Sequence, residues 1–166
     1  SVGTLRAEWP VGSIVIPDDF FALGVAPSFS ESAHFVPRFH PGWRALVVQK
    51  WAEAVAAEGS RRTVLDGGVY AQTNGPRFET PSEVRFLAEY ADIVGMTVAA
   101  ESIVAQEAGL AYAAVCSVDN LANGLDVVPL DTETFRSGLA ATAPSLSSDL
   151  HRALPALVAA VHGDGW

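Results

Sequence analysis

The chain has 166 residues, the size of one domain, and its 49% hydrophobic and 17% charged residues are typical of a globular protein rather than a disordered or fibrous one. Its net charge of −9 argues against a nucleic-acid partner, because a phosphate backbone would be repelled. No apolar run approaches the ~20 residues that a membrane span needs, and no basic segment precedes an apolar core at the start. We therefore predict a cytoplasmic protein with no membrane partner.

The common motifs of metal and cofactor chemistry are missing from the sequence. Its one cysteine, Cys116, lies in an apolar run and is predicted to be a small buried hydrophobe. The histidines do not have metal-ligand spacing. There is no glycine-rich phosphate loop and no HExxH, CxxC or GxSxG motif. The sequence therefore predicts no metal and no organic cofactor.

The first part of the chain alternates short apolar runs with irregular segments. Residues 1–5 resemble the tail of a strand or the turn after it, and residues 12–17 are predicted to form a strand. Residues 26–41 have no clear period and are expected to form a long loop of functional or interfacial use. An amphipathic helix is predicted over residues 42–58, and residues 63–66 lead from it to the central stretch.

The central stretch, residues 70–124, has the pattern of strand, helix, strand, helix, strand. A strand over residues 68–73 is followed by the turn Asn74-Gly75-Pro76. Thr80, Pro81 and Glu83 then form the sequence signature of a capping box with proline at the first helical position.

After that helix, residues 93–96 predict a short strand and residues 99–108 a second helix. Residues 110–118 predict a long apolar strand that ends in Asp119-Asn120. Two terminal helices are expected over residues 132–141 and 145–161, the second interrupted at Pro155. The whole pattern predicts one α/β domain over residues 1–166, a mostly parallel twisted sheet in a three-layer α/β/α arrangement.

Each central strand is followed by polar or small residues. Because ligands gather at the carboxyl ends of parallel strands, these residues are expected to share one site. The candidates are Phe78, Glu79, Met96, Thr97, Asp119 and Asn120. A phenylalanine beside a carboxylate and an amide suits a flat heteroaromatic base, since the ring can stack and the polar groups can bond its edge. Core packing for Phe78, a helix-start charge for Glu79 and a turn role for Asn120 are the alternatives.

The run Gly75-Pro76-Arg77-Phe78-Glu79-Thr80, followed by Gly95-Met96-Thr97 and then Asn120, resembles the trimeric purine nucleoside phosphorylase and methylthioadenosine phosphorylase family. The resemblance is strong over residues 70–124, looser over residues 1–58 and weak beyond residue 125. It implies a nucleoside-phosphorylase-like fold and cleavage of an N-glycosidic bond by inorganic phosphate. The products would be a free purine and a pentose 1-phosphate, as in purine salvage.

The resemblance also implies roles for single residues. Phe78 would stack near the nucleoside, Glu79 would accept a purine N–H, and Met96 would pack under the ribose. Thr97 would donate its hydroxyl to phosphate. Asn120 would be the catalytic residue, bonding the purine's N7 and 6-position as the leaving group gains electrons.

Two further assignments follow from the family. His34 resembles a histidine that members of the methylthioadenosine branch lend to a neighbouring subunit's 5′-pocket, in a homotrimer. Glu79 with Asn120 favours 6-oxopurines, because Glu79 can accept from N1–H, which adenine lacks. Asp119 stands directly before Asn120, and a one-residue shift would bring its carboxylate to the base instead. Methylthioadenosine phosphorylase therefore stays open as an alternative.

Compared with the family, about the N-terminal third, which carries most of the phosphate donors, is expected to be absent. No arginine follows a strand, and Arg77 is expected to be structural. Three interpretations follow: a phosphorylase whose missing part is supplied by another segment or chain, a truncated homologue that binds a purine or nucleoside without catalysis, and a nucleosidase that uses water.

Overall fold

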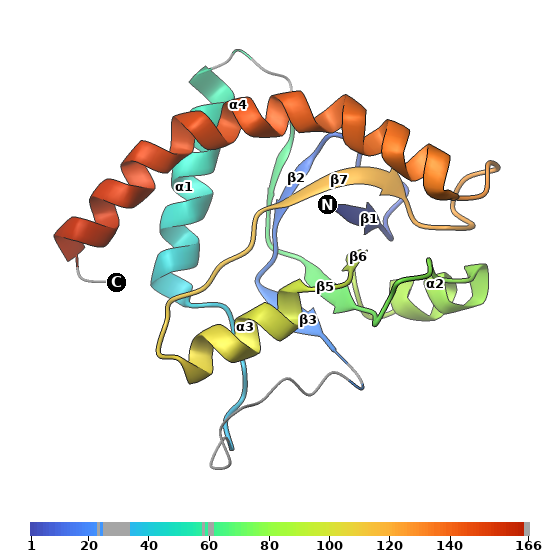
Figure 1. Ribbon diagram of the computed structural model, residues 1–166, viewed down its shortest axis with the longest axis horizontal. Coiled ribbons are helices and arrows are strands. Elements are labelled where there is room, and N and C mark those ends of the chain that lie inside the picture. Colours follow the sequence, from blue (N-terminus) through green and yellow to red (C-terminus); the bar gives the residue numbers. More distant parts are fainter. Residues whose placement is uncertain (23, 25–33, 58, 60–61, 165–166) are drawn as a thin grey trace.

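The computed structural model describes residues 1–22, 24, 34–57, 59 and 62–164 (Figure 1). Within them, a seven-stranded sheet has the order β3-β5-β6-β1-β7-β2-β4. Its strands are β1 (Val2–Thr4), β2 (Ile14–Ile16), β3 (Asp19–Phe21), β4 (Val64–Asp66), β5 (Val69–Gln72), β6 (Ile93–Gly95) and β7 (Cys116–Leu121). The helices are α1 (Pro41–Ala57), α2 (Pro81–Ala88), α3 (Val98–Glu107) and α4 (Thr132–Asp164).

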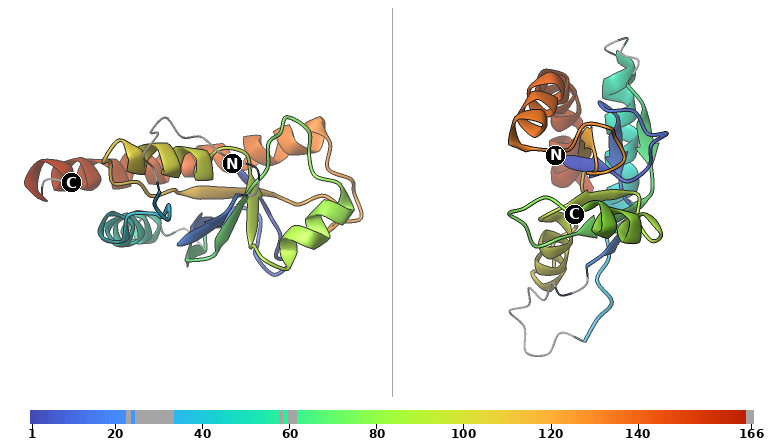
Figure 2. Two further views of the ribbon diagram at one scale, coloured as in Figure 1. Left: turned by 90° about the horizontal axis from the view of Figure 1, so that it is seen from below. Right: turned by 90° about the vertical axis from the view of Figure 1, so that its right-hand side faces the viewer.

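The sheet is mostly parallel, as expected. Four pairings are parallel: β1 with β7, β2 with β4, β3 with β5, and β5 with β6. The pairs β1–β6 and β2–β7 are antiparallel. Consequently β1 and β7 run opposite to β5 and β6, and helices lie on both sides of the sheet (Figure 2). This α/β architecture confirms the predicted fold class.

The chain's first residues occupy the middle of the sheet. The sequence suggested the tail of a strand or the turn after it, and the structure has a strand there: β1 pairs on one side with β6 and on the other with β7. Val2 and Leu5 are 4% and 3% exposed, so burial between two strands decides the conformation of this short segment.

Strand β7 begins later than predicted. The apolar run suggested residues 110–118, whereas the strand is Cys116–Leu121 and includes Asp119 and Asn120. Its pairing starts where Cys116 meets Val15 of β2, and it continues beside β1. Residues 110–115 come before these partners, so their apolar character reflects packing and not a strand ladder.

Helix α2 begins as the capping box predicted. The Thr80 hydroxyl accepts from the Glu83 N–H at 3.2 Å, and Glu83 Oε2 accepts from the Thr80 N–H at 2.8 Å. Helices α2 and α3 cover opposite faces of β5. Tyr70 packs toward Val98 at the start of α3, whereas Ala71 packs against Val84 and Leu87 of α2.

The C-terminal segment is one helix of 33 residues, not the two predicted, and Pro144 and Pro155 lie inside it. An internal proline costs a helix about 3 kcal/mol. Packing offsets that cost: Ala153 and Leu157 are buried against Trp51 of α1, where α4 crosses α1 (Figure 1). Near the start of α4, a side chain at Gly138 would collide with the Asp119 backbone oxygen, which shows how closely the helix approaches β7.

Helix α1 confirms the helix predicted over residues 42–58, and Val47, Trp51, Ala54 and Val55 are its buried residues. The first half of the expected long loop, residues 26–33, lies outside the described residues, which resume at residue 34. No helix among the described ranges combines the length and apolar character that crossing a membrane requires.

Candidate functional site

A cavity of about 620 Å³, called here the main cavity, lies along β6, β1 and β7. The segment around Phe78 and the first residues of α3 and α4 complete its wall. Five of the predicted site residues line it: Phe78, Glu79, Met96, Thr97 and Asn120. A volume of this size is typical of a small-molecule site. The structure therefore brings together residues that span more than forty positions of the sequence.

The direction of β7 differs from the one that the sequence predicted. We expected three carboxyl ends at one edge, but β7 runs opposite to β5 and β6. Asn120 pairs with Gly3, which pairs with Val94, so Asn120 lies beside the middle of β6 and not beyond its end. Asn120 reaches the cavity because its side chain points to the face of the sheet that the cavity occupies.

Asn120 has room for its amide because its neighbour on β1 is a glycine. A Cβ at Gly3 would lie 3.1 Å from Asn120 Nδ2, tighter than an ordinary contact. The amide donates one hydrogen bond to the Leu121 carbonyl at 2.8 Å. An amide nitrogen carries two hydrogens, so the second hydrogen and the side-chain oxygen can serve a ligand.

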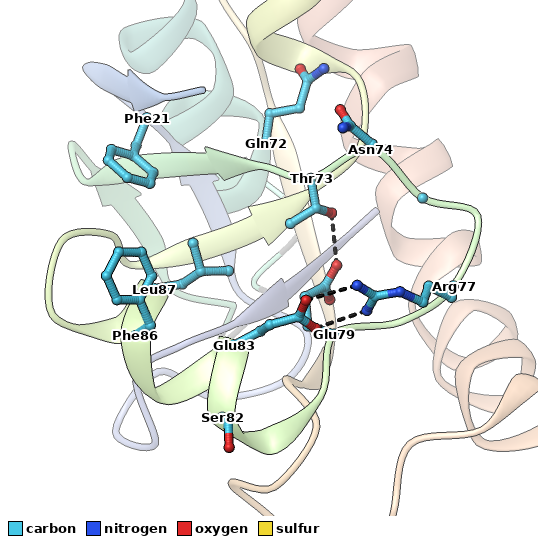
Figure 3. Close-up of a pocket in the computed structure, with 11 residues that line it drawn as sticks. Phe21, Gln72, Thr73, Asn74, Arg77, Glu79, Ser82, Glu83, Phe86 and Leu87 are labelled. Atoms are coloured by element: carbon cyan, nitrogen blue, oxygen red, sulfur yellow. Dashed lines mark hydrogen bonds and ion pairs between the residues drawn. The ribbon is translucent and has the colours of Figure 1, made fainter. Parts of the chain in front are cut away.

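Glu79 is 8% exposed and fixed by its surroundings. Its Oε1 accepts from the Thr73 hydroxyl at 2.7 Å, and its backbone oxygen accepts from Asn123 Nδ2 at 3.0 Å. Glu79 also lines a second hollow of about 500 Å³, the side cavity, whose wall includes Thr73, Arg77 and residues of α2 (Figure 3). The carboxylate therefore lies between two cavities with one oxygen already engaged.

Aromatic and sulfur side chains supply the apolar wall. The rings of Phe78 and Phe135 are 5.5 Å apart between centroids and tilted by 52°. Phe78 is half-buried, so it packs on α4 and still faces the cavity. Met96 lies against Gly75, where a Cβ would come within 2.6 Å of its sulfur.

Thr97 precedes the first residue of α3, and its hydroxyl makes no capping hydrogen bond. Its backbone N–H donates to the Tyr70 hydroxyl at 3.3 Å. The exposed Thr97 hydroxyl is therefore free to bind a group in the main cavity.

Tyr70 and Cys116 line the main cavity but stay protonated at neutral pH. Burial raises the pKa of the Tyr70 hydroxyl to about 12 and that of the Cys116 thiol to about 12. Neither group can therefore act as a ready nucleophile or base, and Cys116 is the buried hydrophobe that the sequence indicated.

The structure does not bring Asp119 to the main cavity. Consecutive residues of a strand point to opposite faces, so Asp119 faces α4 while Asn120 faces the cavity. Its carboxylate is 2% exposed and accepts from the hydroxyls of Ser117 and Thr142. The prediction that Asp119 binds the substrate is therefore wrong for this cavity, and Asn120 is the residue of the pair that lines it.

His34 is exposed and lines neither the main cavity nor the side cavity. The family role places this histidine in a neighbouring subunit's pocket, which a single chain cannot display. Its assignment stays a prediction.

Three residues of α4 were not predicted to be at the site: Thr132, Phe135 and Arg136. They belong to the part of the sequence where the family motifs end, and no local pattern distinguishes them from other residues of an exposed helix. Only the packing of α4 across β7 brings them to the main cavity.

A family model described as the phosphorylase superfamily matches residues 1–154. With the fold and the motif residues around one cavity, this match shows that the chain belongs to the phosphorylase superfamily.

Named relatives share up to two-fifths of the aligned residues. A "Probable 6-oxopurine nucleoside phosphorylase" of Archaeoglobus fulgidus is 41% identical over 133 residues, 79% of this chain and 53% of the relative. A "Probable S-methyl-5'-thioinosine phosphorylase" of Methanosarcina acetivorans is 34% identical over 134 residues, 80% of this chain and 51% of the relative. The chain thus spans about half the length of these relatives.

Solved structures support the same fold. A methylthioadenosine phosphorylase from Schistosoma mansoni in complex with adenine has a TM-score of 0.76 at 21% identity, covering 95% of this chain and 63% of the other. A schistosoma purine nucleoside phosphorylase in complex with hypoxanthine has a TM-score of 0.73 at 26% identity, covering 93% and 59%.

Proposed function

We propose that the protein is a purine nucleoside phosphorylase that prefers 6-oxopurine nucleosides. It would use inorganic phosphate to release the free purine and a pentose 1-phosphate. The observation that carries the proposal is the placement of Phe78, Glu79 and Asn120 around one cavity of ligand size.

The base preference follows from the two polar groups. A 6-oxopurine carries a hydrogen on N1, and the unengaged oxygen of Glu79 can accept it. Adenine has a lone pair at N1, which a carboxylate repels. The second amide hydrogen of Asn120 can bond N7 or O6, and both positions gain electron density as the glycosidic bond breaks.

The names of the relatives agree with this choice of base. The base of thioinosine is hypoxanthine, which is itself a 6-oxopurine, so both kinds of named relatives are named for 6-oxopurine substrates. The side chains of Glu79 and Asn120 support a choice between bases, but they do not distinguish between substituents on the 5′-carbon. A 5′-methylthio substrate is therefore the second candidate, supported by the relatives at 34% to 37% identity.

The test is purine release from inosine with and without inorganic phosphate, measured by chromatography. Release that requires phosphate supports the proposal. Release without phosphate would indicate a nucleosidase, and no release together with hypoxanthine binding would indicate a purine-binding protein. Running 5′-methylthioinosine and adenosine beside inosine resolves the 5′-group and the base separately.

A further inference from the structure

The main cavity contains one positively charged side chain among its described lining residues, that of Arg136. The other charged side chain on its wall is Glu79, which already accepts from Thr73. Burial keeps Tyr70 and Cys116 neutral. Among the described side chains of the cavity, the positive charge that can bind an anion therefore comes from α4.

Arg136 differs from the arginines of the chain that form ion pairs. Four of them pair with carboxylates: Arg6 with Asp92, Arg44 with Asp66, Arg62 with Asp149 and Arg77 with Glu83. For Arg136, no hydrogen bond or ion pair is found within the described part of the chain, and its side chain is exposed. Its guanidinium is thus available to a ligand.

The position of Arg136 is fixed by its helix. Thr132 and Arg136 are four residues apart, so they lie on the same face of α4, and both line the main cavity. Phe135, between them, contacts Phe78. This contact places Arg136 near the segment expected to hold the nucleoside.

We propose that Arg136 is the anion subsite of the main cavity and binds a phosphate dianion. A guanidinium presents a planar fork of donors that matches phosphate oxygens, and the hydroxyls of Thr97 and Thr132 line the same cavity as further donors. This inference rests on the proposed function and adds to it a residue outside the family motifs.

A phosphate group could reach Arg136 from two sources. One is free inorganic phosphate, the proposed co-substrate. The other is a phosphate ester on the 5′-oxygen of the sugar, as in a nucleoside 5′-monophosphate. Both present the same oxygens to the guanidinium, and the experiment separates them.

The experiment is isothermal titration of the whole chain with inorganic phosphate, inosine 5′-monophosphate, inosine and hypoxanthine. The variants are Arg136→Gln, Arg136→Lys and the control Arg152→Gln. Arg152 is an exposed arginine on the same helix and lines neither the main nor the side cavity. Arg152→Gln changes the net charge by the same amount as Arg136→Gln, so it controls for charge.

We expect Arg136→Gln to weaken the binding of one phosphate probe about ten- to a hundredfold, with Arg136→Lys in between. Hypoxanthine should bind as before, and Arg152→Gln should change nothing. A loss for inorganic phosphate identifies the co-substrate as the source. A loss for inosine 5′-monophosphate, down to the affinity of inosine, identifies the 5′-ester.

Unchanged binding of both phosphate probes by Arg136→Gln would overturn the subsite, as would an equal loss in Arg152→Gln. So would failure of the unmodified protein to bind either probe. If phosphate binding depends on Arg136 but hypoxanthine does not bind at all, the subsite stands and the purine proposal fails.

Discussion

The Thr142 hydroxyl on α4 donates to Oδ1 of Asp119 on β7, and the residue after Asp119 is the cavity residue Asn120. This buried hydrogen bond ties the helix that carries Arg136 to the strand that carries Asn120. The hydrogen bond therefore connects α4 and β7, two elements that both contribute residues to the main cavity.

Removing that tie should destabilise the protein. We expect Thr142→Val, which keeps the shape but loses the donor, to lower the free energy of unfolding by about 1–3 kcal/mol, because the Asp119 carboxylate is buried. Thr142→Ser keeps the hydroxyl and should cost less. Urea denaturation measures both, and an unchanged unfolding free energy in Thr142→Val would show that the hydrogen bond to Asp119 does not stabilise the protein.

Asn120→Ala should slow purine release by about 10²–10³-fold if the amide stabilises the leaving purine, by analogy with the loss of one oxyanion donor. The KM for inosine should change less than kcat. Asn74→Ala is the control, because Asn74 lies on the side cavity and not on the main one. An unchanged kcat in Asn120→Ala would remove Asn120 from the mechanism.

Glu79→Gln should weaken hypoxanthine binding about tenfold or more, since a charged acceptor for N1–H becomes a neutral amide. Adenine, which has no N1–H, should bind no worse and so gain relative to hypoxanthine. Titration with the two bases gives the ratio. The exposed Glu89 supplies the matched control, Glu89→Gln, whose ratio should equal that of the unmodified protein.

An ion pair at the start of α2 should make the free energy of unfolding depend on pH. The Arg77 guanidinium, followed by the Thr80 N–H, lowers the pKa of the Glu83 carboxyl from 4.5 to about 2. A lowered pKa in the folded state means that the carboxylate stabilises the protein above pH 4.5 and that this contribution is lost as the pH falls toward about 2.

Glu83→Gln should therefore flatten the fall in unfolding free energy over that pH range, as measured by thermal unfolding at a series of pH values. Glu89→Gln should retain the slope of the unmodified protein. A slope that survives in Glu83→Gln would show that other carboxyl groups cause it.

Gly95 gives room to Tyr70. A side chain at residue 95 would collide with the hydroxyl and ring of Tyr70, which is 1% exposed. We expect Gly95→Ala to cost about 1–3 kcal/mol of stability by overpacking. Tyr70→Phe removes the hydroxyl, so the double variant should recover part of that cost in a double-mutant cycle. Strict additivity of the two substitutions would show that the two residues do not compete for space.

Local chemistry by itself determined several features correctly. Thr80, Pro81 and Glu83 specify the start of α2 because a capping box is satisfied within four residues. The pattern of apolar residues predicted α1. The GPRFET and GMT motifs, with Asn120, indicated the family and the candidate residues Phe78, Glu79, Met96, Thr97 and Asn120, which line the main cavity. These features depend on neighbours in the sequence or on motifs that carry their own spacing.

The tertiary structure decided what depends on distant partners. Strand direction cannot be read from an apolar run, so only the pairing of β1 with β6 and β7 revealed that Asn120 reaches the cavity from an antiparallel strand. The same pairing set β7 in register and turned Asp119 toward α4. The continuity of α4 past two prolines, and the arrival of Arg136 at the cavity, follow from packing against α1 and β7, which no local pattern encodes.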